Sequence, residues 1–137
     1  MKLPMIYIDE FRYKTSVKNL ESAPRIDEEK VIEDALLGFI HAEPEDEENP
    51  SSIETKLVKN LKWAARKNET DTVVLHSFAH LAETKADPEF TKRLLDNAES
   101  RLKNAGYVTH QTPFGYFLDL DLKAPGRSLS RLFKEIK

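Results

Sequence analysis

The sequence predicts an α/β or α+β domain in which helices pack on a mixed β-sheet. Short apolar or alternating runs of strand length recur along the chain, and two segments repeat apolar residues at helical spacing. Strand-like and helix-like segments alternate in order instead of forming separate blocks. With 137 residues, the chain is long enough for one hydrophobic core, so we expect a single domain over residues 1–137.

The first third of the chain is predicted to be mostly strand. Leu3–Ile8 is a short apolar run, and residues 11–14 alternate aromatic and basic side chains, which indicates a second strand. Residues 16–30 are polar and contain Pro24, so we expect a loop with one helical turn near residues 27–30. The nearly continuous apolar run 35–42 is typical of a central strand buried on both faces.

Five acidic residues crowd the segment 43–50 between two prolines. Carboxylates are the ligands that calcium prefers, but the spacing of a calcium-binding loop is absent, so we expect a solvated loop. Ser51 and Glu54 then have the spacing of a capping box, which predicts a helix start. The apolar stripe of this helix is Ile53, Leu57, Val58, Leu61, Ala64 and Ala65.

The second half of the chain continues the alternation. Thr72–Leu75 is a buried strand, and a helix runs from Asp87 as N-cap to Gly106 just past its last turn. Residues 107–111 form a short strand. The alternating segment 114–123 places Tyr116, Leu118, Leu120 and Leu122 on one face. A final helix is expected over residues 128–136.

Composition excludes several kinds of chemistry. The chain has no cysteine, which excludes disulfides, thiolate zinc sites and cysteine nucleophiles. Its net charge of −3 gives no overall attraction to nucleic acid, so such binding would depend on a local basic patch. No run approaches the roughly 18–20 apolar residues of a membrane helix, and no signal peptide is evident. We therefore expect a cytoplasmic protein with no membrane partner.

Two histidines four residues apart, His76 and His80, are the most conspicuous candidates for chemistry. They would share a metal only on one helix, and here a strand end and a turn separate them, so we expect no metal site. His80 follows the end of a strand, where ligand crevices open in layered sheets. Whether it binds a ligand or only caps the turn stays open on spacing alone.

Other candidate features are weaker. Asp119 and Asp121 share a strand face and could form a carboxylate pair, but a solvated face is the favoured interpretation. From Lys123 onward the chain carries five basic residues against Glu135, a local patch that either contacts phosphate or is a solvated surface. No nucleotide-binding, serine hydrolase or metalloprotease motif is present.

Four motifs in order resemble one family. They are F-I-x-x-E-x-x-D-E-x-N-P at residues 39–50, S-F-A-H-L at 77–81, P-F-G-Y at 113–116 and G-x-x-L-x-x-L at 126–132. Together they span nearly the whole chain. The sequence is similar to the N-terminal editing domain of archaeal threonyl-tRNA synthetases.

The resemblance implies a D-aminoacyl-tRNA deacylase-like fold and hydrolysis of the ester of serine mischarged on threonine tRNA. It implies a hollow where the F-A-H-L turn and the P-F-G-Y strand converge, sized for an esterified adenosine. His80 and Gly115 would be its catalytic residues, with Gly115 supplying main-chain donors and space. The implied substrate-binding residues are Ser77, Phe78, Ala79, Phe114, Tyr116, Phe117, Leu118 and Arg131. No cofactor is implied.

The chain departs from this family at several positions. Tyrosine and lysine in the family correspond to Phe117 and Leu118, and a glutamate corresponds to Arg131. The proline before F-A-H-L is Ser77. An apolar residue at 118 discriminates acyl groups less sharply than a hydrogen-bonding one. The resemblance therefore predicts a deacylase whose acyl specificity has changed.

The expected partners are the acceptor end of tRNA, a threonyl-tRNA synthetase, and a second copy of the chain in a homodimer. A non-catalytic tRNA-binding or synthetase-partner module is the alternative of another class. Hydrolysis of small amino-acid esters or amides is a third hypothesis, for which no autonomous nucleophile is visible.

Overall fold

A computed structural model describes residues 1–137, and its six strands form one mixed sheet with the order β4-β3-β2-β1-β5. β1 pairs antiparallel with β2, while β2, β3 and β4 are parallel to one another. β5 and β6 pair with different halves of β1. The strand bounds are β1 (Lys2–Lys18), β2 (Glu29–Ile40), β3 (Thr72–Ser77), β4 (Val108–Gln111), β5 (Tyr116–Lys123) and β6 (Arg131–Glu135).

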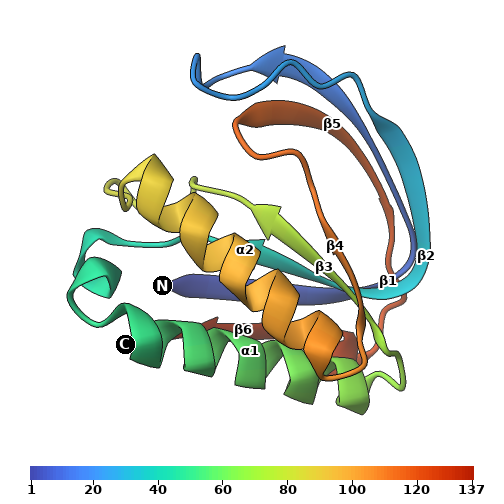
Figure 1. Ribbon diagram of the computed structural model, residues 1–137. Coiled ribbons are helices and arrows are strands. Elements are labelled where there is room, and N and C mark those ends of the chain that lie inside the picture. Colours follow the sequence, from blue (N-terminus) through green and yellow to red (C-terminus); the bar gives the residue numbers. More distant parts are fainter.

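The two long strands bend together, and Figure 1 shows β1, β2 and β5 curling at one side of the molecule. Ile8 and Phe11 belong to the same buried cluster although they are three positions apart, an odd spacing that places side chains on opposite faces of a regular strand. The inward-facing side of β1 therefore switches between them. Asp34, opposite this point on β2, has a positive φ of 50°, and its carboxylate accepts a hydrogen bond from the Tyr7 hydroxyl over 2.6 Å. This irregularity lets apolar side chains line the inside of the curl on both halves.

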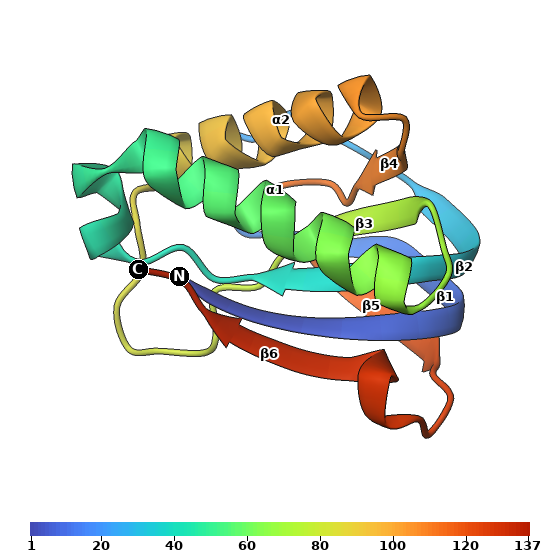
Figure 2. The same cartoon turned by 90° about the horizontal axis from the view of Figure 1, so that it is seen from below.

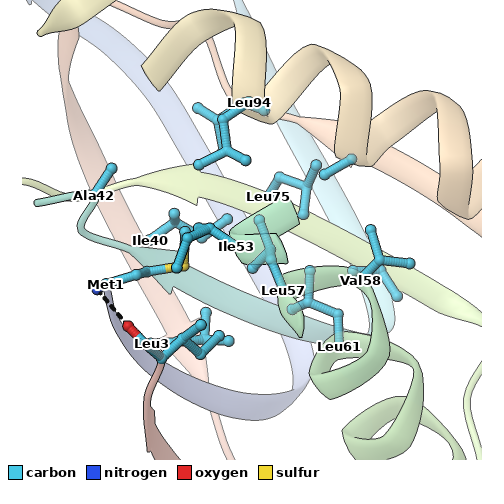
Figure 3. Close-up of a cluster of buried hydrophobic side chains, with 14 of the residues drawn as sticks. Met1, Leu3, Ile40, Ala42, Ile53, Leu57, Val58, Leu61, Leu75 and Leu94 are labelled. Carbon is cyan, nitrogen blue, oxygen red and sulfur yellow. Dashed lines mark hydrogen bonds between the residues drawn. The ribbon is translucent and has the colours of Figure 1, made fainter. Parts of the chain in front are cut away.

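Two helices, α1 (Pro50–Lys67) and α2 (Pro88–Asn104), lie side by side on the other face of the sheet (Figure 2). Their apolar faces and one face of β1, β2 and β3 form the larger core, part of which is drawn in Figure 3. α1 approaches β2 closely at Gly38, where an added Cβ would lie 2.8 Å from Leu61 Cδ2. Neither helix is sufficiently long and apolar to span a membrane.

The predicted N-terminal cap is confirmed for α2 and wrong for α1. The Asp87 carboxylate caps α2 by accepting from the Glu89 N–H over 2.8 Å, as expected. The capping box predicted at Ser51 is wrong, because α1 begins one residue earlier at Pro50 and its N-cap Asn49 makes no side-chain capping bond. Proline at the first helical position has no N–H to satisfy, so the helix needs one cap fewer.

The acidic run 43–50 contains a buried structural carboxylate. Asp46 is 3% exposed and pairs with the buried amino group of Met1 over 3.1 Å. Its second oxygen accepts the Glu43 N–H over 2.7 Å, and Met1 N also donates to the Ile136 carbonyl over 2.8 Å, the dashed line of Figure 3. The run forms a 3₁₀ turn, Pro44–Glu48, not merely a solvated loop.

Three other expectations about elements are wrong. The two predicted N-terminal strands are one strand, β1, and residues 27–30 enter β2 instead of forming a helical turn. The predicted C-terminal helix over 128–136 is a short 3₁₀ turn, Ser128–Ser130, followed by β6. Its apolar residues have helical spacing, but the first half of β1 offers a free edge. Pairing with that edge buries Ile136 and packs Leu132 on the core, so tertiary pairing overrides local periodicity.

Candidate functional site

A hollow of about 110 Å³ opens where the C-terminal ends of β2 and β3 meet the start of α2 and the connection between β4 and β5. The end of β1 closes another side through Asn19 and Leu20. Two segments far apart in sequence therefore converge here, as the sequence predicted. The expected site residues that line the hollow are Ser77, Ala79, His80, Phe114, Gly115, Tyr116 and Phe117.

Aromatic contacts fix the imidazole of His80 between both segments. The ring lies edge to face with Phe78, with centroids 5.0 Å apart, and stacks on Phe117 at 6.3 Å. Phe78 in turn packs edge to face on Phe39 of β2. No hydrogen bond to protein occupies either ring nitrogen of His80, so both stay accessible to a ligand.

The remaining expected residues lie outside the hollow. Phe78 and Leu118 pack against the smaller core cluster inside the curl. Arg131 is exposed on β6, paired with Ile6, a residue that contacts the same cluster. His80 touches both groups, because its two aromatic neighbours are Phe117 in the hollow and Phe78 on the cluster side.

Gly115 has a backbone conformation that favours glycine, with φ at 85°. A Cβ added there would lie 2.8 Å from the Cβ of Ala23 and 3.3 Å from that of Leu20. Its carbonyl accepts from the N–H groups of Asn19 and Leu20 over 2.8 and 3.3 Å. The glycine therefore joins the P-F-G-Y turn to the segment after β1, and this segment occupies the space on its Cα side.

Several main-chain donors in the lining have no protein acceptor. The N–H groups of Ala79, His80 and Gly115 make no backbone hydrogen bond, and no side chain accepts from them. His80 is exposed and Ala79 and Gly115 are half-buried, so these donors are open to water or to a ligand oxygen.

His76 lies at the inner wall of the hollow and is 6% exposed. Burial, with a smaller contribution from the nearby His80, lowers its pKa to about 4, so it is neutral at pH 7. Its Nδ1 lies 2.9 Å from the Thr112 hydroxyl. The sequence assigned His76 only to a strand end. The position after the buried run of β3 was the available signal, because such ends converge on crevices.

His41 organises the loop that carries His80. It is fully buried at the end of β2, its Nε2–H donates to the Thr84 carbonyl over 2.8 Å, and its Nδ1 accepts the Leu81 N–H over 3.1 Å. The sequence analysis did not assign His41 a function. Nothing in the sequence marks this role, since the two partners lie about forty residues away.

Lys85, on the same loop, also lines the hollow. Its side chain is exposed and makes no ion pair. Since no Asp or Glu lines the hollow, Lys85 is its one charged side chain apart from the titratable histidines. No local sequence pattern marks Lys85, because it reaches the hollow only when the loop folds over the strand ends.

A second, more open hollow of about 490 Å³ adjoins the first. Leu20, Pro88 and Phe114 line both, so they form the shared wall. Its charged lining residues all belong to α2 and comprise Glu89, Lys92, Arg93 and Asp96. The two hollows together have the size of an ordinary small-molecule site, roughly 300–1,000 Å³, whereas the first alone is smaller. No three His, Asp or Glu side chains gather where a metal ion could bind.

Comparison with solved structures identifies the fold. The structure of a protein titled "c-Myc DNA Unwinding Element Binding Protein" superposes with a TM-score of 0.74, covering 100% of this chain and 99% of that one at 10% identity. At this identity the likeness concerns the fold alone. The molecule has the D-aminoacyl-tRNA deacylase-like layered fold, a mixed sheet with helices packed on it, which confirms the predicted fold class.

Comparison of sequences identifies the family. The family described as the archaea-specific editing domain of threonyl-tRNA synthetase matches residues 1–136, and the chain belongs to it. Curated relatives called threonine–tRNA ligase are 34% identical in Methanosphaera stadtmanae and Methanopyrus kandleri, and 30% in Thermococcus sibiricus. Each alignment covers 99% of this chain but 22% of the relative. The chain thus spans about a fifth of the length of these relatives, and the predicted resemblance is confirmed.

Proposed function

We propose that this chain hydrolyses the ester bond of a mischarged tRNA, with an acyl specificity different from that for serine. The main support is that His80 and the P-F-G-Y turn converge on one hollow, and that residues lining this hollow have main-chain N–H groups without a protein acceptor. Membership of the editing-domain family supplies the class of reaction.

The sizes of the two hollows support a binding mode in which the aminoacyl group and the terminal adenosine occupy different hollows. The first, at about 110 Å³, has room for a small aminoacyl group but not for a nucleoside as well. The adjoining hollow, at about 490 Å³, would hold the terminal adenosine against Phe114 and Pro88. The ester would then lie at the shared wall, next to Gly115.

The chemistry would come from positioned polar groups, since the hollow has no carboxylate and no nucleophile activated by a base. Free N–H groups near Ala79 and Gly115 would donate to the carbonyl oxygen as negative charge develops on it. His80 would hold the amino group or the adenosine end. The terminal 2′-hydroxyl of the tRNA itself would help to orient the attacking water, as the family resemblance implies.

Lys85 is placed to contact a phosphate at the mouth of the first hollow. Its ammonium is exposed and unpaired, so it can neutralise a charge without breaking an existing contact. Such a contact would favour binding of the tRNA end more than the chemical step. Lys85→Gln should therefore raise KM with little change in kcat.

The altered acyl specificity is inferred from two positions at which the chain departs from its family. Leu118 and Arg131 stand where the family has a lysine and a glutamate, and Leu118 packs on the cluster that Phe78 also contacts. A site without a hydrogen-bonding partner for a substrate hydroxyl discriminates weakly between acyl groups. We expect a broader acyl range than a seryl-specific site has.

A panel of misacylated tRNAs, including seryl, threonyl and D-aminoacyl forms, tests the proposal with the 137-residue chain. Turnover of at least one form, lowered at least tenfold by His80→Ala and unaffected by His110→Ala, is the expected result. His110 is the matched control because it lies on β4 away from the hollow. Binding of tRNA without turnover of any form would instead indicate the non-catalytic module.

Self-association is a further part of the proposal. β5 pairs with β1 only, so its other edge is free, and Leu120 and Leu122 on its inner face are 39% and 38% exposed. Free strand edges with apolar neighbours pair readily with another chain. A dimer by light scattering is expected, and Leu120→Lys should convert it to a monomer.

A further inference from the structure

Folding brings two basic segments of an acidic chain together. Helix α1 contains five basic residues and one acid, and residues 123–137 contain five basic residues and one acid. The remainder of the chain therefore has 11 basic residues against 22 acidic ones. β6 pairs with the first half of β1 at the border of the sheet, as Figure 2 shows, and its Lys134 lies over the Trp63 ring of α1, so the two basic segments meet on one side of the molecule.

A groove of about 500 Å³ runs between these two elements. Four of its six lining residues are basic and none is acidic. Lys59, Lys62 and Arg66 come from one face of α1, at helical spacing, and Lys134 comes from β6. Trp63 and Asn60 complete the lining.

The groove cations have no carboxylate partners. None of the four forms an ion pair, whereas the other helix, α2, pairs Lys92, Arg101 and Lys103 with carboxylates. Arg66 only donates to the Tyr107 hydroxyl over a long 3.4 Å, and the Lys134 ammonium lies 5.4 Å from the centroid of the Trp63 ring. Like charges that line one groove repel one another, so a row of phosphates bound along the groove would relieve this repulsion.

We propose that this α1–β6 groove binds the phosphate backbone of double-helical RNA. A backbone presents a row of single negative charges, which matches a row of unpaired cations that project from a rigid helix and strand. Phosphate contacts of this kind position RNA without reading its sequence. The groove shares no lining residue with either hollow of the candidate site, so it is a separate binding surface.

The salt dependence of RNA binding can be predicted from the number of phosphates that the groove contacts. Each phosphate neutralised changes the slope of log K against log salt by about 0.9 for a duplex. Three cations of α1 engaging three phosphates would therefore contribute a slope of roughly 2 to 3. Their removal should weaken binding by at least about tenfold near 0.1 M salt.

The test measures binding of a blunt, unacylated RNA duplex to the full chain by fluorescence anisotropy at several salt concentrations. Lys59→Gln/Lys62→Gln/Arg66→Gln should show the weaker binding and reduced slope. The control Lys14→Gln/Arg25→Gln/Lys30→Gln removes the same charges from exposed, unpaired positions and should bind like wild type. Equal losses in the two variants, or no loss in the first, would overturn the proposal.

A competition separates RNA from other polyanions. Polyglutamate at the same concentration of charge should not displace the duplex, and displacement would overturn the assignment to RNA. Ester hydrolysis is followed separately on a short aminoacylated CCA fragment, which is too small to reach the groove. The groove variant should retain this hydrolysis, so failure of the groove and failure of the deacylase proposal give different results.

Discussion

The main-chain N–H of Leu81 donates to Nδ1 of His41 over 3.1 Å, which ties the loop after β3 to the end of β2. The other ring nitrogen of His41 donates to Thr84, so one buried imidazole fixes two points of this loop. Both points flank residues that reach the hollow, since His80 precedes Leu81 and Lys85 follows Thr84. The geometry of the candidate site therefore depends on a histidine outside it.

Replacing His41 by alanine should loosen this loop. Two hydrogen bonds disappear and a buried donor loses its acceptor, which lowers the free energy of unfolding by roughly 2–4 kcal/mol. Hydrogen exchange at Leu81 should accelerate more than at amides of α2, and ester hydrolysis should fall. His110→Ala is the control, because the half-buried imidazole of His110 makes no hydrogen bond to protein. Unchanged exchange at Leu81 would show that His41 does not hold the loop.

Stability should depend on pH through His76. Burial lowers its pKa from 6.5 to about 4, so between these values the unfolded chain binds a proton that the folded chain does not. The contribution is therefore fully present above about pH 6.5 and is lost as the pH falls toward 4, by roughly 3 kcal/mol in total.

The measurement compares urea unfolding of wild type and His76→Gln from pH 7 to pH 4. Glutamine keeps a hydrogen-bonding group beside Thr112 but does not titrate in this range. The difference between the two proteins should shrink or reverse on acidification, while effects of carboxylates cancel. A difference that is constant with pH would mean that His76 protonates equally in both states.

Alanine substitutions at the two glycines with positive φ distinguish the cost of backbone strain from the cost of steric crowding. Gly106→Ala places a Cβ in open space at φ 92°, so only the left-handed conformation is penalised, by about 1–2 kcal/mol. Gly115→Ala has a similar φ and also places its Cβ 2.8 Å from that of Ala23. We expect a loss of stability larger by at least about 1 kcal/mol, with reduced ester hydrolysis. Equal losses in thermal unfolding would show that the turn yields without strain.

Acyl specificity can be tested by restoring the family's charges. Leu118→Lys with Arg131→Glu should raise hydrolysis of seryl-tRNA, because a lysine at the position after Phe117 restores a group that can hydrogen-bond the seryl hydroxyl. Leu122→Lys with the same Arg131→Glu is the control, since Leu122 shares the face of β5 but lies farther along it. No gain in a folded double variant would place acyl selection elsewhere in the hollow.

Local sequence signals predicted much of the fold. The buried run in β2, the Asp87 cap of α2 and the alternation in β5 each depend on residues close in sequence, and the structure shows all three. The C-terminal strand could not be predicted in this way, because β6 exists through a partner about 130 residues away. The bend at Asp34 is also invisible locally, since aspartate tolerates both ordinary and left-handed conformations.

The candidate site was only partly accessible from sequence. The two motifs that carry His80 and Gly115 indicated their convergence, which the structure shows. Lys85, His41 and the segment 19–20 carry no local signal, because their roles arise when loops close over strand ends. The roles of Leu118 and Arg131 stay predictions from the resemblance.

The position of β6 also affects how the molecule is built. Its partner, the first half of β1, lies about 130 residues earlier in the chain and is therefore made well before residues 131–135. Until β6 emerges, the edge of β1 that it pairs with has no partner strand. Contacts between segments so distant in sequence form slowly. Assembly on the ribosome should therefore finish in a single late step, and chains cut before residue 131 should stay sensitive to proteases.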